Sequence, residues 1–247
     1  MWEETAVKLS RLAALDRRRQ VFGADYHDYE LFSTLSAEEL REVEDAWGAR
    51  FPQELRAFYQ EVGDGVAGPY YGVNPSVRVT PYRPSEPYTE VATFRALASH
   101  ASDDNYVTVN RDDLTGLFGV IDEGCGHEIC VVTKGPHADE VIMLSIEGSL
   151  HETGLTFHRF YEQWLDRELG KFDFVKDLMS SVATFEEIET GVLDKFGTYD
   201  APDIIVSVAD VEKPVDLFGT THSRIYHGAT QKPWYESVLR EWREANS

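Results

Sequence analysis

The chain has 247 residues, of which 42% are hydrophobic and 12% aromatic, and this composition indicates a folded globular protein. Its 44 acidic and 23 basic residues give a net charge of −21, which argues against direct binding to the phosphate backbone of nucleic acids. The sequence shows no apolar run of membrane-spanning length, no leader-like start and only two cysteines, so we expect a cytoplasmic protein without a disulfide framework.

The first thirty residues predict one helix. Val7, Leu9, Leu12 and Leu15 recur at helical spacing, and a short basic run at 17–19 follows them. Three basic residues suit the C-terminal turn of a helix, where they complement the macrodipole, and are too few to predict contact with nucleic acid.

Residues 35–48 carry the start and stop signals of a second helix. Ser36 and Glu39 have the spacing of a reciprocal capping box, in which each side chain accepts the backbone N–H of the other residue. Leu40 and Trp47 lie on one predicted apolar face. Gly48 can end the helix because glycine adopts the left-handed conformation without a Cβ penalty.

A third helix is predicted directly after this turn. Pro52 suits the first helical position, where its missing N–H loses no hydrogen bond. Leu55 and Phe58 begin a second apolar stripe, and the glycine-rich stop at 63–65 ends it. Two short helices joined this tightly must bury their apolar stripes against each other or against a sheet.

Residues 68–88 combine glycines, five prolines and four tyrosines. Prolines at this density exclude a helix interior or a central strand, so we expect an ordered loop or a series of edge segments. Tyrosines on a proline-stiffened loop suit a recognition surface, and the alternative is that the rings cover the sheet.

Four strands are predicted downstream, at residues 106–109, 117–122, 128–133 and 140–146. Short glycine turns between them imply antiparallel pairing, because parallel strands need a longer crossover. With helices before and after, the pattern predicts an α+β fold: an antiparallel sheet of about five to six strands flanked by helices.

Several of these segments, taken in order, resemble the SUKH superfamily, which includes bacterial toxin-immunity proteins and fungal cell-wall-assembly regulators. The resemblance covers roughly residues 30 to 170 and departs modestly from the usual form at Phe51 and at Asp64-Gly65. The matching segments are Trp47-Gly48, Phe51-Pro52-x-Glu54-Leu55, Phe58, Gly63-Asp64-Gly65, the hairpin of 117–122 and 129–132, and an amphipathic helix with Phe157, Phe160, Tyr161, Trp164 and Leu165.

The resemblance ends near residue 170, so we expect a SUKH-like domain with an N-terminal helical extension at 1–170 and a C-terminal extension at 171–247. The latter reads as an additional α/β region. Its signals are a capping box at Thr184 and Glu187, a strand at 204–208 and a final helix through Trp234 and Trp242.

Two tempting motifs predict neither a metal nor a cofactor. Residues 63–68 fit the spacing G-x-G-x-x-G, but a helix precedes the glycines where a nucleotide site needs a strand. Cys125, His127 and Cys130 could supply zinc ligands, but His127 and Cys130 are three apart and face opposite sides of a strand. We expect Cys130 to be a core residue, and we assign no catalytic residue.

The resemblance implies a non-enzymatic protein-binding module, an immunity protein that neutralises a cognate toxin by docking. The acidic charge would suit a basic toxin such as a nuclease, and we expect neither nucleic acid nor membrane as a direct partner. Alternatives are a regulatory scaffold in a larger assembly and an enzyme using Cys125 and His127. The oligomeric state stays open. The candidate partner-binding residues are Asp64, Tyr70, Tyr71, Tyr82, Asp103, Asp104, Asp122 and Glu123.

Overall fold

A computed structural model describes residues 1–16, 19, 21–89, 110–145 and 150–181, with side chains described up to residue 173. The helices are α1 (Thr5–Leu15), α2 (Ala24–His27), α3 (Ala37–Trp47), α4 (Gln53–Glu61) and α6 (Phe157–Ser181). The strands are β1 (Thr80–Tyr82), β2 (Leu117–Gly124), β3 (His127–Val132), β4 (Glu140–Leu144) and β5 (Leu150–Thr156), and two short 3-10 helices are η1 (Ser76–Arg78) and η2 (Arg111–Asp113).

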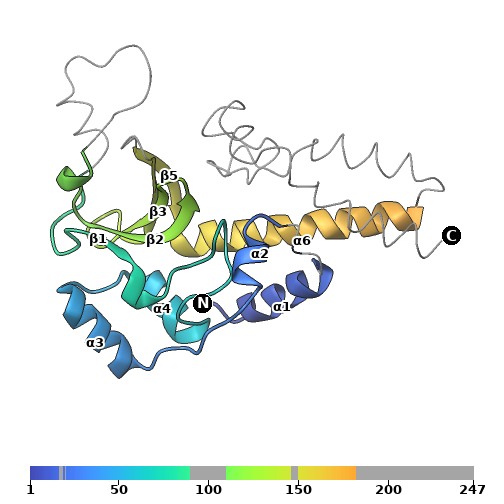
Figure 1. Cartoon of the computed structure of the whole chain (residues 1–247), viewed down its shortest axis with the longest axis horizontal. Helices are drawn as coiled ribbons and strands as arrows, with labels where there is room; N and C mark the ends of the chain where they lie inside the picture. The colour runs from blue at the N-terminus through green and yellow to red at the C-terminus, as the bar shows by residue number, and fades with distance from the viewer. Residues whose placement is uncertain (17–18, 20, 90–109, 146–149, 182–247) are drawn as a thin grey trace, which may run out of the picture.

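The five strands form one antiparallel sheet in the order β1-β2-β3-β4-β5, each strand pairing with its neighbour in sequence. Helix α6 contacts β4 and β5, α4 packs against α6, and α1 lies along α6 (Figure 1). The predicted α+β fold with an antiparallel sheet flanked by helices is therefore confirmed.

The sheet separates two apolar clusters, as the period-two geometry of strands requires. In β4, Val141 and Met143 belong to the large cluster beneath the helices, while Ile142 and Leu144 belong to a smaller cluster on the opposite face. Both faces of β4 are thus buried, which explains why its sequence is apolar at consecutive positions.

An aromatic group joins the N-terminus, α4 and α6 in the large cluster. The Trp2 ring lies 4.9 Å from that of Phe58 and 5.6 Å from that of Tyr161, in edge-to-face arrangements. The Tyr161 hydroxyl donates to the carbonyl of Ala67, at the start of the proline- and tyrosine-rich segment. Helix α6 thereby fixes one end of that segment.

The helix signals of residues 35–65 act as predicted, with one shift. The Ser36 hydroxyl accepts the Glu39 N–H at 3.2 Å, and the Glu39 carboxylate accepts the Ser36 N–H at 2.8 Å. Gly48 adopts the left-handed conformation at the end of α3. Pro52 occupies the N-cap of α4 rather than its first helical position, because its ψ of 160° is extended.

The strand predictions at 117–122, 128–133 and 140–146 correspond to β2, β3 and β4. Strand β5 was not predicted, because its polar side chains and Gly154 obscure the alternation of its buried residues Thr153 and Leu155. Strand β1 is an edge segment within the proline-rich passage, as expected there.

The remaining expectations concern the C-terminal part of the chain. Helix α6 runs without interruption through residue 170, so the expected boundary falls inside a helix and the two-region division stays a prediction. The strand expected at 106–109 and all the elements expected beyond 181 lie outside the described residues.

Candidate functional site

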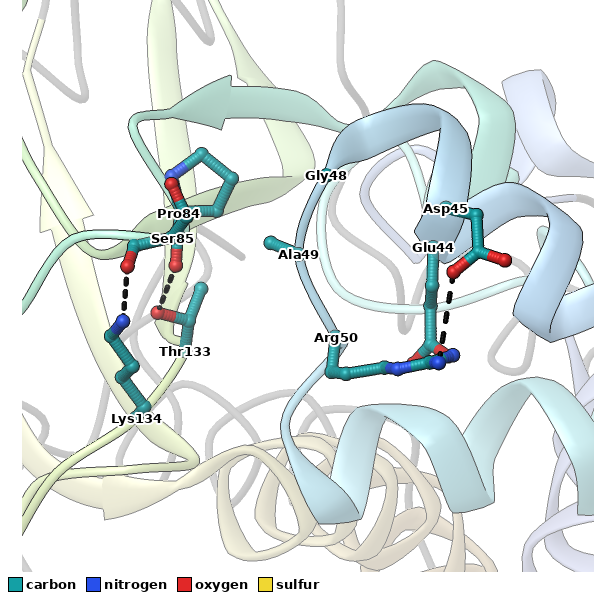
Figure 2. A pocket seen from close by; sticks show the side chains of 9 residues that line it. All are labelled: Glu44, Asp45, Gly48, Ala49, Arg50, Pro84, Ser85, Thr133 and Lys134. Atoms are coloured by element: carbon teal, nitrogen blue, oxygen red, sulfur yellow. Dashed lines mark hydrogen bonds and ion pairs between the residues drawn. The ribbon is translucent and has the colours of Figure 1, made fainter.

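A shallow groove of about 500 Å³ lies between the turn joining α3 to α4 and the segment that follows β1. Its lining residues are Glu44, Asp45, Gly48, Ala49, Arg50, Pro84, Ser85, Thr133 and Lys134 (Figure 2). This set holds no histidine or cysteine, so the groove offers neither a thiol nucleophile nor an imidazole base.

The polar side chains that line the groove form ion pairs and hydrogen bonds within the protein. Figure 2 shows Arg50 turned toward Glu44 and Asp45, with its guanidinium nitrogens 2.6 Å and 3.6 Å from their carboxylate oxygens. On the opposite wall, the Thr133 hydroxyl donates to the carbonyl of Pro84 at 2.8 Å, and Lys134 donates to the carbonyl of Ser85. These contacts hold the walls of the groove in place.

Glu44 is one of the residues that line this groove and is only 1% exposed. Its carboxylate accepts the Phe51 N–H at 2.9 Å and pairs with the guanidinium groups of Arg50 and Arg56. A buried carboxylate needs such compensation because desolvation penalises its charge. Glu44 was not predicted as a site residue, although its position four residues after Leu40 places it on the buried side of α3.

A different surface forms where residues 70–73 run beside the β2–β3 hairpin. The backbone N–H of Tyr71 donates to the Asp122 carbonyl at 3.4 Å, and the Tyr70 hydroxyl donates to the Glu123 carboxylate. The Tyr71 ring lies against Gly124, where an added Cβ would come within 2.9 Å of it. Four of the predicted partner-binding residues, from two distant segments, therefore meet here.

Tyr26 of α2 completes this surface and was not predicted. Its side chain is 75% exposed, and its ring stands edge-on to that of Tyr71 at 5.3 Å. On its inner side, the Tyr71 ring contacts that of Phe22 at 5.5 Å. No sequence pattern pointed to Tyr26, because α2 has only four residues and lies far from Tyr71 along the chain.

Two exposed carboxylates, those of Asp25 and Asp122, flank the tyrosine pair. Asp25 directly precedes Tyr26 in α2, and the Asp122 backbone accepts the Tyr71 N–H. Burial, the largest cause, and then the neighbouring Cys125, Asp122 and Asp25 raise the pKa of the Tyr71 hydroxyl. Within the described residues neither forms an ion pair with Lys or Arg, and Asp122 accepts the Gly124 N–H at 2.7 Å. We call Tyr26, Tyr71, Asp25 and Asp122 the tyrosine–acid surface.

Glu123 lies beneath this surface and is partly buried. Burial raises its pKa to about 8; the hydrogen bond from Tyr70 lowers the pKa, and the neighbouring Asp122 charge raises it. One of its carboxylate oxygens is buried without a hydrogen-bond partner. Glu123 therefore holds a proton near neutral pH.

The other predicted partner-binding residues lie elsewhere. Asp64 accepts the Ser76 N–H at 2.6 Å and so closes the loop into η1. Tyr82 is buried, with 8% of its surface exposed, and so is Tyr70 at the surface described above, with 3%. Neither ring therefore offers the exposed aromatic face that the sequence led us to expect. Tyr82 belongs to the cluster on the opposite face of the sheet, where its hydroxyl donates to Glu128. Asp103 and Asp104 lie outside the described residues.

The two cysteines occupy unlike environments. Cys130 is fully buried in the smaller cluster, as predicted, and burial raises the pKa of its thiol. Cys125 is exposed on the hairpin turn with a φ of 53°. Across the part of the chain that the structure describes, no group of three or more His, Cys, Asp or Glu side chains is arranged to hold a metal ion.

Comparison with known proteins identifies a family. The model of the SMI1 / KNR4 family (SUKH-1) matches residues 34–163, more than half of the chain. Searches of curated proteins and of solved structures found no match. Among the described helices, none has the length and apolar character needed to cross a membrane. The match spans α3, α4, the strands β1 to β5 and the start of α6, and the chain belongs to the SMI1 / KNR4 family (SUKH-1).

Proposed function

We propose that this chain is a cytoplasmic immunity protein, a protein-binding module without catalytic activity that neutralises a cognate bacterial toxin by direct docking. Membership of the SMI1 / KNR4 family supports a protein-binding module. The observation that carries the proposal is the tyrosine–acid surface, which combines the exposed ring of Tyr26 and the half-buried ring of Tyr71 with carboxylates that have no Lys or Arg partner among the described residues.

The physical requirements of such inhibition are modest. A docked protein needs an interface of about 1,600 Å² in total, with a few aromatic anchors at its centre and complementary charge around them. Tyr26 and Tyr71 are suited to anchoring because a tyrosine ring buries a large area at little cost in side-chain entropy. No reactive group is required, because occlusion of the toxin's own site suffices.

The net charge of −21 favours a basic toxin, such as a nuclease with a positive substrate-binding surface. Opposite charges steer two proteins together and raise the association rate at low salt. Since salt screens this attraction over about 10 Å at 0.1 M, the association rate should fall about tenfold or more between 20 mM and 300 mM salt.

The direct test uses the protein encoded by the gene immediately upstream. That protein is expressed in a host cell alone and together with this chain, and growth is measured. We expect expression of the upstream protein to arrest growth, co-expression to restore it, and the purified pair to form a stable complex whose association slows with salt. A toxic neighbour that this chain neither binds nor neutralises would contradict the proposal, and constitutive binding to housekeeping proteins without protection would favour a scaffold.

A further inference from the structure

The tyrosine–acid surface depends on an unusually close approach of α2 to the segment 70–72. Gly23, which precedes α2, has a φ of 77°, and a Cβ there would overlap the backbone carbonyl of Tyr70. At Gly72 an added Cβ would come within 2.7 Å of the Val66 carbonyl and 3.5 Å of the His27 side chain. Two glycines therefore let the backbones meet, and this contact positions Tyr26 against Tyr71.

The buried carboxylate of Asp16 connects the residues on either side of α2. Asp16 accepts the Val21 N–H at 2.9 Å and the Tyr29 hydroxyl at 2.8 Å, which braces the residues before and after the helix. Tyr26 is thus exposed on a fixed support. An exposed ring on a fixed support loses little freedom when it binds, which is the property expected of a binding anchor.

The two carboxylates near Tyr26 have no Lys or Arg partner among the described residues. Arg19, the described Lys or Arg nearest in sequence to Tyr26, pairs with Asp28 and lies over the Tyr29 ring at 5.1 Å, so it is already engaged. His27, which follows Tyr26, has its pKa lowered to about 4 chiefly by burial. Asp25 and Asp122 are exposed next to the two tyrosines: Asp25 directly precedes Tyr26, and the Asp122 carbonyl accepts the Tyr71 N–H. A cation brought to this surface by a partner would meet two carboxylates and the negative faces of aromatic rings.

We propose that the tyrosine–acid surface binds an arginine side chain presented by a basic segment of the partner protein. This inference rests on the proposed function and names the chemistry of the partner at one surface. Arginine fits better than lysine because its planar guanidinium stacks on aromatic rings and can hydrogen-bond to carboxylates through several N–H groups at once. Lysine offers a strongly hydrated point charge with less affinity for a ring.

The position of this surface relative to the family match adds to the inference. The match begins at residue 34, so Asp25 and Tyr26 belong to the N-terminal extension, while Tyr71 and Asp122 lie within the matched region. The extension thus supplies half of the surface. A short extension of this kind can set partner choice without altering the core, since loops and termini tolerate change better than the elements that they cover.

The first experiment measures binding of two synthetic peptides, hexa-arginine and hexa-lysine, to the full chain by calorimetry at 50 mM salt. We expect hexa-arginine to bind at least about fivefold more tightly than hexa-lysine. In the double variant Asp25→Asn with Asp122→Asn, hexa-arginine binding should weaken about tenfold, and in Tyr26→Ser about fivefold.

Matched controls separate this surface from the general negative charge. Glu3→Gln with Glu42→Gln removes two other exposed carboxylates, and Phe32→Ser removes another exposed ring. Each control should change hexa-arginine affinity less than about twofold. Equal weakening in the controls, or equal affinity for the two peptides, would overturn the proposal. Thermal unfolding of each variant establishes that the fold is retained.

A second measurement keeps this inference distinct from the proposed function. The same variants are tested for binding to the protein encoded upstream. If the wild-type chain neutralises that toxin and the Asp25→Asn/Asp122→Asn variant binds it equally well, the surface inference fails and the immunity function stands. If the chain neutralises no toxin yet binds hexa-arginine through this surface, the function fails and the surface stands.

Discussion

Two acidic regions of this molecule use their carboxylates in opposite ways. In the groove at the α3–α4 turn, Glu44 is buried and its charge is balanced by Arg50 and Arg56. At the tyrosine–acid surface, Asp25 and Asp122 are exposed and have no basic partner within the described residues. The first arrangement stabilises the fold, and the second is available to another protein.

The comparison shows why an acidic residue cannot be assigned a role from its type alone. The α3–α4 groove is a pocket, yet its polar side chains already have ion-pair or hydrogen-bond partners within the protein. The exposed carboxylates of the tyrosine–acid surface, Asp25 and Asp122, have no Lys or Arg partner among the described residues. For a chain that acts by docking, the unsatisfied surface is the better candidate, because charge that is already paired contributes little to a new contact.

The largest effect is expected from breaking the ion pairs of the groove. Glu44→Gln should lower the free energy of unfolding by about 3 kcal/mol, because it leaves two guanidinium groups beside a neutral buried side chain. Urea denaturation measures this change. The control is Asp45→Asn, which lies one residue away but is exposed, and it should cost less than about 0.5 kcal/mol. Similar losses in the two variants would show that Glu44 has no special structural role.

The next effect concerns the support of the tyrosine–acid surface. Gly23→Ala should destabilise the protein by about 2–3 kcal/mol, since a Cβ would overlap the Tyr70 carbonyl in a backbone conformation that already disfavours alanine. It should also displace Tyr26 from Tyr71 and weaken hexa-arginine binding. Gly48→Ala is the matched control, because its φ is 66° and an added Cβ meets nothing within 4 Å; about 1 kcal/mol is expected there.

The free energy of unfolding should depend on pH through Glu123, which lies beneath the tyrosine–acid surface. Its pKa in the folded protein, about 8, lies above the ordinary value of 4.5, so the native state keeps the proton to higher pH than the unfolded chain does. Its contribution to stability is therefore present below about pH 4.5 and is lost as the pH rises through about 8.

The Glu123→Gln variant tests this pH dependence, because glutamine cannot ionise. At pH 9 it should be more stable than the wild type by on the order of 2 kcal/mol, and the difference should vanish near pH 4. Denaturant unfolding of both proteins across this range measures the difference. His27, whose pKa is lowered to about 4 chiefly by burial, contributes with the opposite sign but cancels in the comparison. A difference independent of pH would contradict the assignment of the raised pKa to Glu123.

The smallest effect should come from the exposed carboxylates. Asp25→Asn with Asp122→Asn should change the free energy of unfolding by no more than about 0.5 kcal/mol, because neither side chain pairs with a basic group and asparagine can still accept the Gly124 N–H. Thermal and urea unfolding both report it. A loss comparable to that of Glu44→Gln would mean that these charges support the fold, and the contrast between the regions would disappear.

Much of the fold could be predicted because its signals are local. The capping box at Ser36 and Glu39, the glycine stop at 48 and the apolar runs of β2, β3 and β4 each act within a few residues of themselves. Strand β5 escaped prediction because it is an edge strand with polar residues between its buried positions. The sequence places Tyr82 in a loop, but its side chain is buried in the structure, because tertiary packing decides whether a ring is exposed to solvent.

The candidate site divides in the same way. The sequence by itself indicated the family, the antiparallel α+β arrangement, the acidic charge and four residues that meet at one surface, Tyr70, Tyr71, Asp122 and Glu123. Only the tertiary structure separated the buried Tyr70 from the more exposed Tyr71, added Tyr26 from α2 and set the compensated Glu44 apart from Asp25 and Asp122. The physical reason is that helix and strand signals depend on neighbours in sequence, whereas exposure and charge compensation depend on contacts between distant segments.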